Sequence, residues 1–194
     1  MSKSDPSSAR RERIKTIRWV VTIFLVTIFV SGVITLISEE IMSNNGIAVS
    51  FVILLIIVLI GIFFDILGVA VTAADEAPFH SMASRKVPGA LEAIRLLRNA
   101  ERASSICNDV IGDICGVVSG TAAATIAARL LVRFEFSWPT MVGLLMSACV
   151  SGLTVGGKAI GKTFAVNSST SIVHFAGKVI AVFHKGEKPA KSKK

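Results

Sequence analysis

The sequence predicts an all-α integral membrane protein: a bundle of four membrane-spanning helices with a cytoplasmic belt of amphipathic helices. Of its 194 residues, 52% are hydrophobic and only 18% are charged, whereas soluble domains carry roughly 25% charged residues. The charges are clustered, and the apolar stretches between them reach the roughly 20 residues that a helix needs to cross a bilayer. The length suits one helical bundle and leaves no room for a sizeable second domain.

Two apolar stretches near the N-terminus predict the first two spans. The apolar stretch 17–37 is too long for the apolar region of a signal peptide, so it predicts a retained span. The short acidic segment 38–46 is expected to be a loop. Residues 47–74 predict a second span that is longer than the bilayer core requires. Within it, Gly61 and Gly68 are expected to allow close helix packing or a bend.

The belt is predicted from two segments that mix apolar and charged residues. Residues 75–105 show helical spacing of apolar and basic residues, interrupted by Pro78 and Pro88. Such a helix is expected to lie along the membrane face. Residues 158–184 are expected to form a surface or half-inserted helix, and the lysine-rich tail 185–194 is expected to be disordered.

The third and fourth spans are predicted at residues 106–131 and 138–157. The third is rich in Gly, Ala, Ser and Thr, which let helices approach closely, so it is expected to lie centrally in the bundle. Trp138 at the start of the fourth span is a candidate interfacial anchor.

Positive charge predicts the orientation. Six Lys and Arg residues lie in the first 18 residues, five lie in segment 75–105 and six lie from Lys178 onward, whereas segment 38–46 has none. Basic segments stay in the cytoplasm. We therefore expect a multi-pass protein of the bacterial inner (plasma) membrane with both termini cytoplasmic. The expected division is a basic cytoplasmic N-terminus at 1–16, a transmembrane domain at 17–184 and the tail.

Polar residues within the apolar segments mark the candidate site, because a charge at the bilayer centre costs a few kcal/mol and needs a partner or a polar cavity. Two acidic residues and two lysines are each spaced four apart, so each pair shares a helix face. Carboxylate, amide and hydroxyl oxygens suit a hard cation such as Mg²⁺. The candidate metal ligands are Asp65, Thr72, Asn108, Asp109 and Asp113, and the candidate gating or salt-bridge residues are Lys158 and Lys162.

A second interpretation of the same residues is structural. Asp109 and Asp113 could be neutralised by Lys158 and Lys162 in a ladder that holds the bundle together and carries nothing. The sequence does not predict an enzyme, because neither a phosphate-binding loop nor a catalytic triad can be assigned in it. Its net charge of +8 lies next to apolar spans, so we expect a lipid bilayer rather than nucleic acid as the partner.

Several motifs follow one another in an order typical of a known family. The second span ends in the segment 64–73, which reads FDILGVAVTA. A leucine-containing and arginine-containing hairpin follows, with residues 90–91 and 96–102, and then the segment 104–109, which reads SSICND. The last motif is the segment 157–162, which reads GKAIGK.

In this order and spacing, residues 47–184 resemble the transmembrane domain of the cyclin M and CorC (CorB-like) family, which is associated with Mg²⁺ transport. The resemblance implies three core spans, a cytoplasmic belt and a homodimer, with residues 17–37 as an extra span. Relatives continue into nucleotide-sensing CBS domains, so regulation here is expected from a separate cytoplasmic protein.

The chain departs from the family pattern at several site positions. Asp65 and Leu67 stand where the family has serines, and Gly68 stands where it has a glutamate. In the last motif, Lys158 replaces a glutamate and Gly161 replaces a proline. The residues that carry over are Thr72, Asn108 and Lys162.

The resemblance implies a membrane cation transporter with Mg²⁺ as the ion and no cofactor. The polar residues would supply its ligands and the two lysines would gate the site. The alternative is a non-transporting membrane scaffold or regulatory protein that retains the bundle with a salt-bridged Asp/Lys core. A third interpretation is movement of protons or Na⁺ along the acidic residues.

Overall fold

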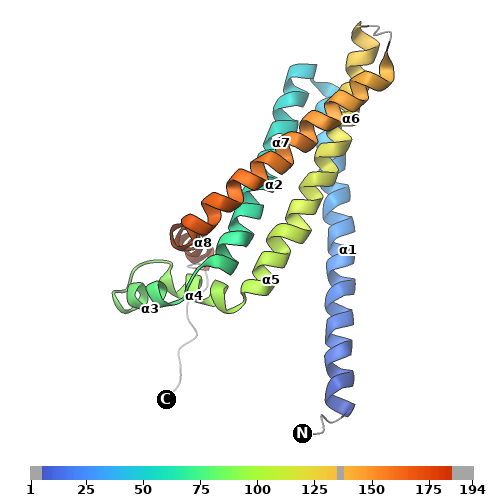
Figure 1. The fold of residues 1–194 in the computed structure, drawn as a ribbon. Coiled ribbons are helices and arrows are strands. Elements are labelled where there is room, and N and C mark those ends of the chain that lie inside the picture. The colour runs from blue at the N-terminus through green and yellow to red at the C-terminus, as the bar shows by residue number, and fades with distance from the viewer. Residues whose placement is uncertain (1–5, 135–137, 185–194) are drawn as a thin grey trace.

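A computed structural model describes residues 6–134 and 138–184, and over these ranges the chain is helical without strands (Figure 1). The expected disordered tail, 185–194, lies outside the described residues. Four helical segments are long and apolar enough to cross a membrane: Thr16–Asn44, Ile47–Ala73, Ala100–Phe134 and Pro139–Asn167. The prediction of an all-helical protein with four candidate spans is therefore confirmed.

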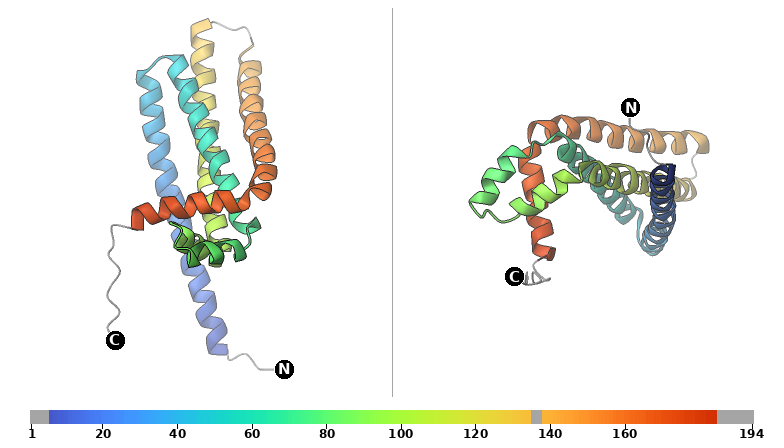
Figure 2. Two further views of the ribbon diagram at one scale, coloured as in Figure 1. Left: turned by 90° about the vertical axis from the view of Figure 1, so that its left-hand side faces the viewer. Right: turned by 90° about the horizontal axis from the view of Figure 1, so that it is seen from below.

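The first candidate span lies within a longer helix than the sequence suggested. Helix α1 runs over Pro6–Asn44, so the prediction of a loop from residue 38 onward is wrong as far as Asn44. Its N-terminal part extends past the other helices (Figure 2). Apolar side chains are exposed along α1, and its main packing partners are α6 and α2.

The core of the bundle consists of three packed helical segments. Helix α2 spans Ile47–Ala73 and packs against α6, Asp113–Phe134, and α7, Pro139–Asn167. Helix α6 also contacts α1 and α7, as expected for a central span. The fourth span was expected to end near Gly157, but α7 continues to Asn167.

Short helices form a layer across one end of the bundle, which we call the belt end. They are α3 (Ala77–Ser84), α4 (Ala90–Arg98) and α8 (Ser169–His184). Helix α8 lies across the ends of the spans rather than along them (Figure 2). Helices therefore form this layer within the predicted segments 75–105 and 158–184, but residues 100–105 belong to the candidate span Ala100–Phe134 and residues 158–167 belong to α7.

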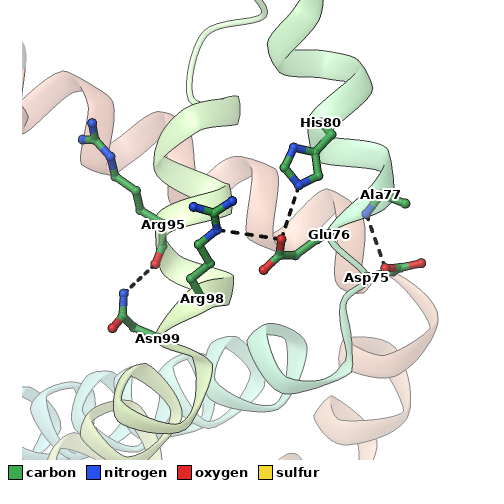
Figure 3. Close-up of polar contacts among 7 residues, drawn as sticks. All are labelled: Asp75, Glu76, Ala77, His80, Arg95, Arg98 and Asn99. Carbon is green, nitrogen blue, oxygen red and sulfur yellow. Dashed lines mark hydrogen bonds and ion pairs between the residues drawn. The ribbon is translucent and has the colours of Figure 1, made fainter.

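Polar contacts join the parts of the belt (Figure 3). The carboxylate of Glu76, next to α3, lies 3.3 Å from His80 Nε2 and 4.0 Å from Arg98 Nε of α4. At the same C-terminal end of α4, Asn99 Nδ2 donates a hydrogen bond to the carbonyl of Arg95 at 2.9 Å. Glu76 therefore links α3 to α4.

Gly89 lets α4 approach α8 closely. It precedes α4 with φ +84°, a conformation that L-residues with a side chain rarely adopt. A Cβ atom there would lie 2.6 Å from the backbone nitrogen of Lys178, and one at Gly177 would clash with the Gly89 carbonyl. Two glycines thus bring backbone against backbone where the belt meets α8.

Arg129 joins three helices at the opposite end, which we call the far end. Its guanidinium donates hydrogen bonds to the carbonyls of Met42 and Asn45, the latter at 3.2 Å, and to Ser50 Oγ at 3.4 Å. The carbonyls at a helix C-terminus carry partial negative charge, which a cation stabilises. Arg129 of α6 thus caps α1 and holds the start of α2.

We expect Arg129→Gln to lower the free energy of unfolding by about 2 kcal/mol, because hydrogen bonds to charged groups contribute about 1.5–3 kcal/mol. Thermal unfolding in detergent measures the loss. Arg133→Gln is the matched control, since Arg133 is exposed one turn further along α6. Equal effects of the two substitutions would contradict this role of Arg129.

Candidate functional site

The candidate site lies where three helical segments meet. Between α5 (Ala100–Ser105) and α6, residues Ile106–Gly112 form a π-helical turn, η1. A Cβ atom at Gly68 of α2 would collide with the side-chain amide of Asn108 in η1. A Cβ atom at Gly161 of α7 would lie 2.6 Å from Ile66 Cγ1 of α2. Glycines thus bring η1 and α7 close to the same turn of α2.

An ion pair forms the centre of this site. Lys158 Nζ of α7 lies 3.2 Å from Asp65 Oδ1 of α2, and the two side chains are 25% and 8% exposed. The same Nζ atom lies 3.6 Å from where a Cβ atom of Gly112 would stand, so it also touches the end of η1. The ammonium therefore lies beside the end of η1 while it pairs with the buried carboxylate.

Two buried oxygen atoms at the site have no hydrogen-bond partner among the described residues. They are Asp65 Oδ2 and Asn108 Oδ1. The amide nitrogen of Asn108 donates to Ser104 Oγ at 3.2 Å, which leaves its oxygen directed at Gly68. A buried acceptor without a donor costs about 1–3 kcal/mol. Both oxygens can therefore accept a hydrogen bond from water or coordinate a cation.

The site lies inside the candidate membrane-spanning region. Asp65 precedes the end of α2 at Ala73 by eight residues, which is about 12 Å at about 1.5 Å per residue. The whole helix is about 40 Å long by the same measure, against about 30 Å for a bilayer core. A bilayer spanned by α2 would therefore place Asp65 within the hydrocarbon, closer to the belt end.

The other predicted site residues lie apart from this centre. Thr72 is exposed, and its hydroxyl donates to the carbonyl of Val69 in its own helix at 2.9 Å. Asp109, Asp113 and Lys162 are also exposed and form no ion pair in the part of the chain that is described. Within that part, no group of three or more His, Cys, Asp or Glu side chains could hold a metal ion.

The pairing within the site differs from the ladder considered above. Lys158 was assigned there to Asp109 and Asp113, but it pairs with Asp65. Asp109 follows Asn108, which touches Gly68, and Lys162 follows Gly161, which touches Ile66. Asp109 and Lys162 therefore lie at the same height along α2, on the outside of the molecule.

A groove lies between α6 and α7. Its volume is about 510 Å³. Small residues line it on both sides, so it was signalled in the sequence by Gly116-x-x-x-Gly120 and the alanines that follow. On α6 they include Gly116, Gly120, Ala124 and Ala128, and on α7 Gly143, Ser147 and Ser151.

Comparison with known proteins finds no matching family model, curated protein or solved structure.

Proposed function

We propose that the protein is a membrane cation transporter, with Mg²⁺ as the expected ion, whose site lies between α2, η1 and α7. The observation that carries this proposal is the pair of buried oxygens without a donor, Asp65 Oδ2 and Asn108 Oδ1. Carboxylate and amide oxygens are ligands that Mg²⁺ accepts, together with several water molecules. The family resemblance of residues 47–184 supports the same ion.

Lys158 acts in this proposal as a tethered cation. Its ammonium neutralises Asp65 when no ion is bound, which removes the cost of an isolated charge inside a membrane. A divalent ion at Asp65 and Asn108 would repel the Lys158 ammonium. Because the Lys158 side chain is partly exposed, it can move away from the site. Ion binding and release would then alternate with formation of the Asp65–Lys158 pair.

The belt end faces the cytoplasm of a bacterial inner membrane in this proposal. The start of α1, the belt helices and the end of α8 all lie at that end (Figure 2). Residues 1–18, 75–105 and 178–194 carry 17 of the 21 Lys and Arg residues, whereas the connection between α1 and α2 carries none. The positive-inside rule then places both termini in the cytoplasm. A separate regulatory protein could bind the basic belt there.

We also propose that the protein is a homodimer joined along the groove between α6 and α7. Small residues four apart allow close approach of membrane helices. Asp109 and Lys162 are exposed at a similar level along α2, and neither has an ion-pair partner within the described chain. Around a twofold axis along the membrane normal, Asp109 of one subunit can meet Lys162 of the other, so dimerisation would neutralise charges that lipid would not tolerate.

The ion pair also favours a second candidate function. A bundle closed by Asp65 and Lys158 could serve as a scaffold or regulatory membrane protein without moving an ion. Carboxylate ligands other than Asp65 lie on the outside of the subunit, and the site has no net charge when Lys158 is protonated. This candidate requires only that the pair be stable.

Calorimetric titration of the purified protein with Mg²⁺ separates the two candidates. For a transporter we expect saturable binding that Asp65→Asn weakens at least about tenfold, equivalent to about 1.4 kcal/mol. Lys158→Met should strengthen binding because it removes the competing cation. Asp75→Asn is the control, since that carboxylate is exposed in the belt and accepts a hydrogen bond from Ala77 N.

Lack of saturable binding by a folded protein, with Mg²⁺, Mn²⁺ and Na⁺ alike, would contradict the transporter and leave the scaffold as the better account. Equal weakening by Asp65→Asn and Asp75→Asn would contradict the proposed site. Binding lost only with Asp65→Asn would justify flux measurements in vesicles.

A further inference from the structure

A second polar crevice lies between α1 and the rest of the bundle, away from the ion site. Its volume is about 510 Å³. Thr16 and Trp19 of α1 form one wall, and Glu101, Arg102 and Ser105 of α5 form the other. A base, an acid, two hydroxyls and an indole ring thus face a space that the preceding sections leave without a role.

The crevice lies at the level where a bilayer surface would be. Helix α2 and the α5–α6 segment run antiparallel, with Gly68 against Asn108 and Gly61 against Cys115. Arg102, one to two turns before Asn108, is therefore level with the end of α2 near Ala73. Charged groups and tryptophan side chains prefer this interfacial region of a membrane.

Lipid can reach the crevice from the side of the bundle. Helix α1 packs mainly on α6 and α2, and it lies apart from α5 in Figure 1. Going toward the far end, the next turns of both helices carry exposed apolar side chains, among them Val20 of α1 and Ile106 of η1. If a lipid headgroup were bound in the crevice, its acyl chains would extend toward the far end and contact apolar side chains of both walls.

We propose that this crevice binds the headgroup of a zwitterionic aminophospholipid such as phosphatidylethanolamine. Arg102 forms no ion pair within the described chain and can pair with the phosphate, which the Ser105 hydroxyl can also contact. Glu101 can accept hydrogen bonds from the ammonium group, and the Trp19 ring can hold the same cation by a cation–π interaction. Among the described residues that line the crevice, one acid and one base match a headgroup that has no net charge.

Fluorescence of Trp19 in lipid nanodiscs tests the proposal. Trp138→Phe removes the other tryptophan, which lies at the far end of the bundle. A minor fraction of lipid brominated near the head of its acyl chains then quenches Trp19 on contact. We expect brominated phosphatidylethanolamine to compete for the crevice about fivefold better than brominated phosphatidylcholine, because the latter cannot donate hydrogen bonds to Glu101.

Two substitutions and one control make the test specific. Glu101→Gln should remove the preference for the ethanolamine lipid, and Arg102→Gln should weaken quenching by both lipids. Arg85→Gln removes the same charge directly after α3, which lies on the opposite side of the bundle from α1 (Figure 1), and should change neither. Soluble phosphoethanolamine should not relieve quenching, because it lacks the acyl chains.

Equal quenching by both lipids in the parent protein would overturn the proposal. Such quenching would report only non-specific contact of Trp19 with the lipid that surrounds any membrane protein. A preference for brominated phosphatidylglycerol would overturn the zwitterionic ligand, and relief by soluble phosphoethanolamine would overturn a lipid source. Because these readouts do not involve Mg²⁺, they stand or fall independently of the proposed transport.

Discussion

Lys158→Met is expected to destabilise the protein by about 3 kcal/mol, the largest effect of any single substitution at the candidate site. The change leaves the Asp65 carboxylate without its partner while its side chain is only 8% exposed. Removing one member of a buried ion pair typically costs about 3–5 kcal/mol. We choose the lower end because the Lys158 side chain is partly exposed and the pair is not fully removed from solvent.

Substitution of the other member of the pair should destabilise the protein less. Asp65→Asn leaves the lysine charge, which can move outward on its flexible side chain. The double variant Asp65→Asn with Lys158→Met should recover most of the lost stability, because neither charge remains buried. Thermal unfolding in detergent measures all three variants. Lys178→Met, which removes an exposed lysine from α8, is the control.

Additive effects in this cycle would contradict a coupled pair in the folded protein. If the double variant is stable but no longer binds Mg²⁺, stability and ion binding are separate properties of the site. A double variant that matches the parent protein in stability and in every ion measurement would instead support the scaffold.

Hydropathy predicted the candidate spans but not where their helices end. The segment after residue 37 is polar, and it was taken as a loop for that reason. Glu39 and Glu40 are good helix formers, and the helix continues until Asn44, before Asn45 and Gly46. In the same way, the lysines after Gly157 do not interrupt α7, because Lys158 finds a carboxylate inside the bundle.

The sequence identified the charged residues that lie within the candidate spans, but it could not predict which of them form ion pairs. Asp109 and Asp113 were assumed to share an α-helical face toward the lysines. The π-helical turn η1 changes that phase, since it has more residues per turn than an α-helix. Asn108 then lies against α2 while Asp109 and Asp113 are exposed. The rotation of a helix about its axis depends on packing, which the spacing of polar residues alone does not give.

Gly120→Leu is expected to separate the proposed dimer into monomers without disturbing the fold of the subunit. A Cβ atom at Gly120 would meet no heavy atom of another described segment within 4 Å, so the subunit has room for a larger side chain. A partner helix seated in the groove would be pushed away, because close approach needs small residues there. We expect the dissociation constant to rise at least about tenfold, equivalent to about 1.4 kcal/mol.

Single-molecule photobleaching in bilayers measures the dimer fraction, and thermal unfolding checks the subunit. Gly152→Leu is the matched control, because it adds the same atoms to an equally open position of α7 outside the groove. Lys162→Met should also weaken the dimer if Asp109 of the partner subunit neutralises that lysine. A dimer that survives Gly120→Leu would contradict this interface, and Asp109 and Lys162 would then need another neutralising partner at the same depth.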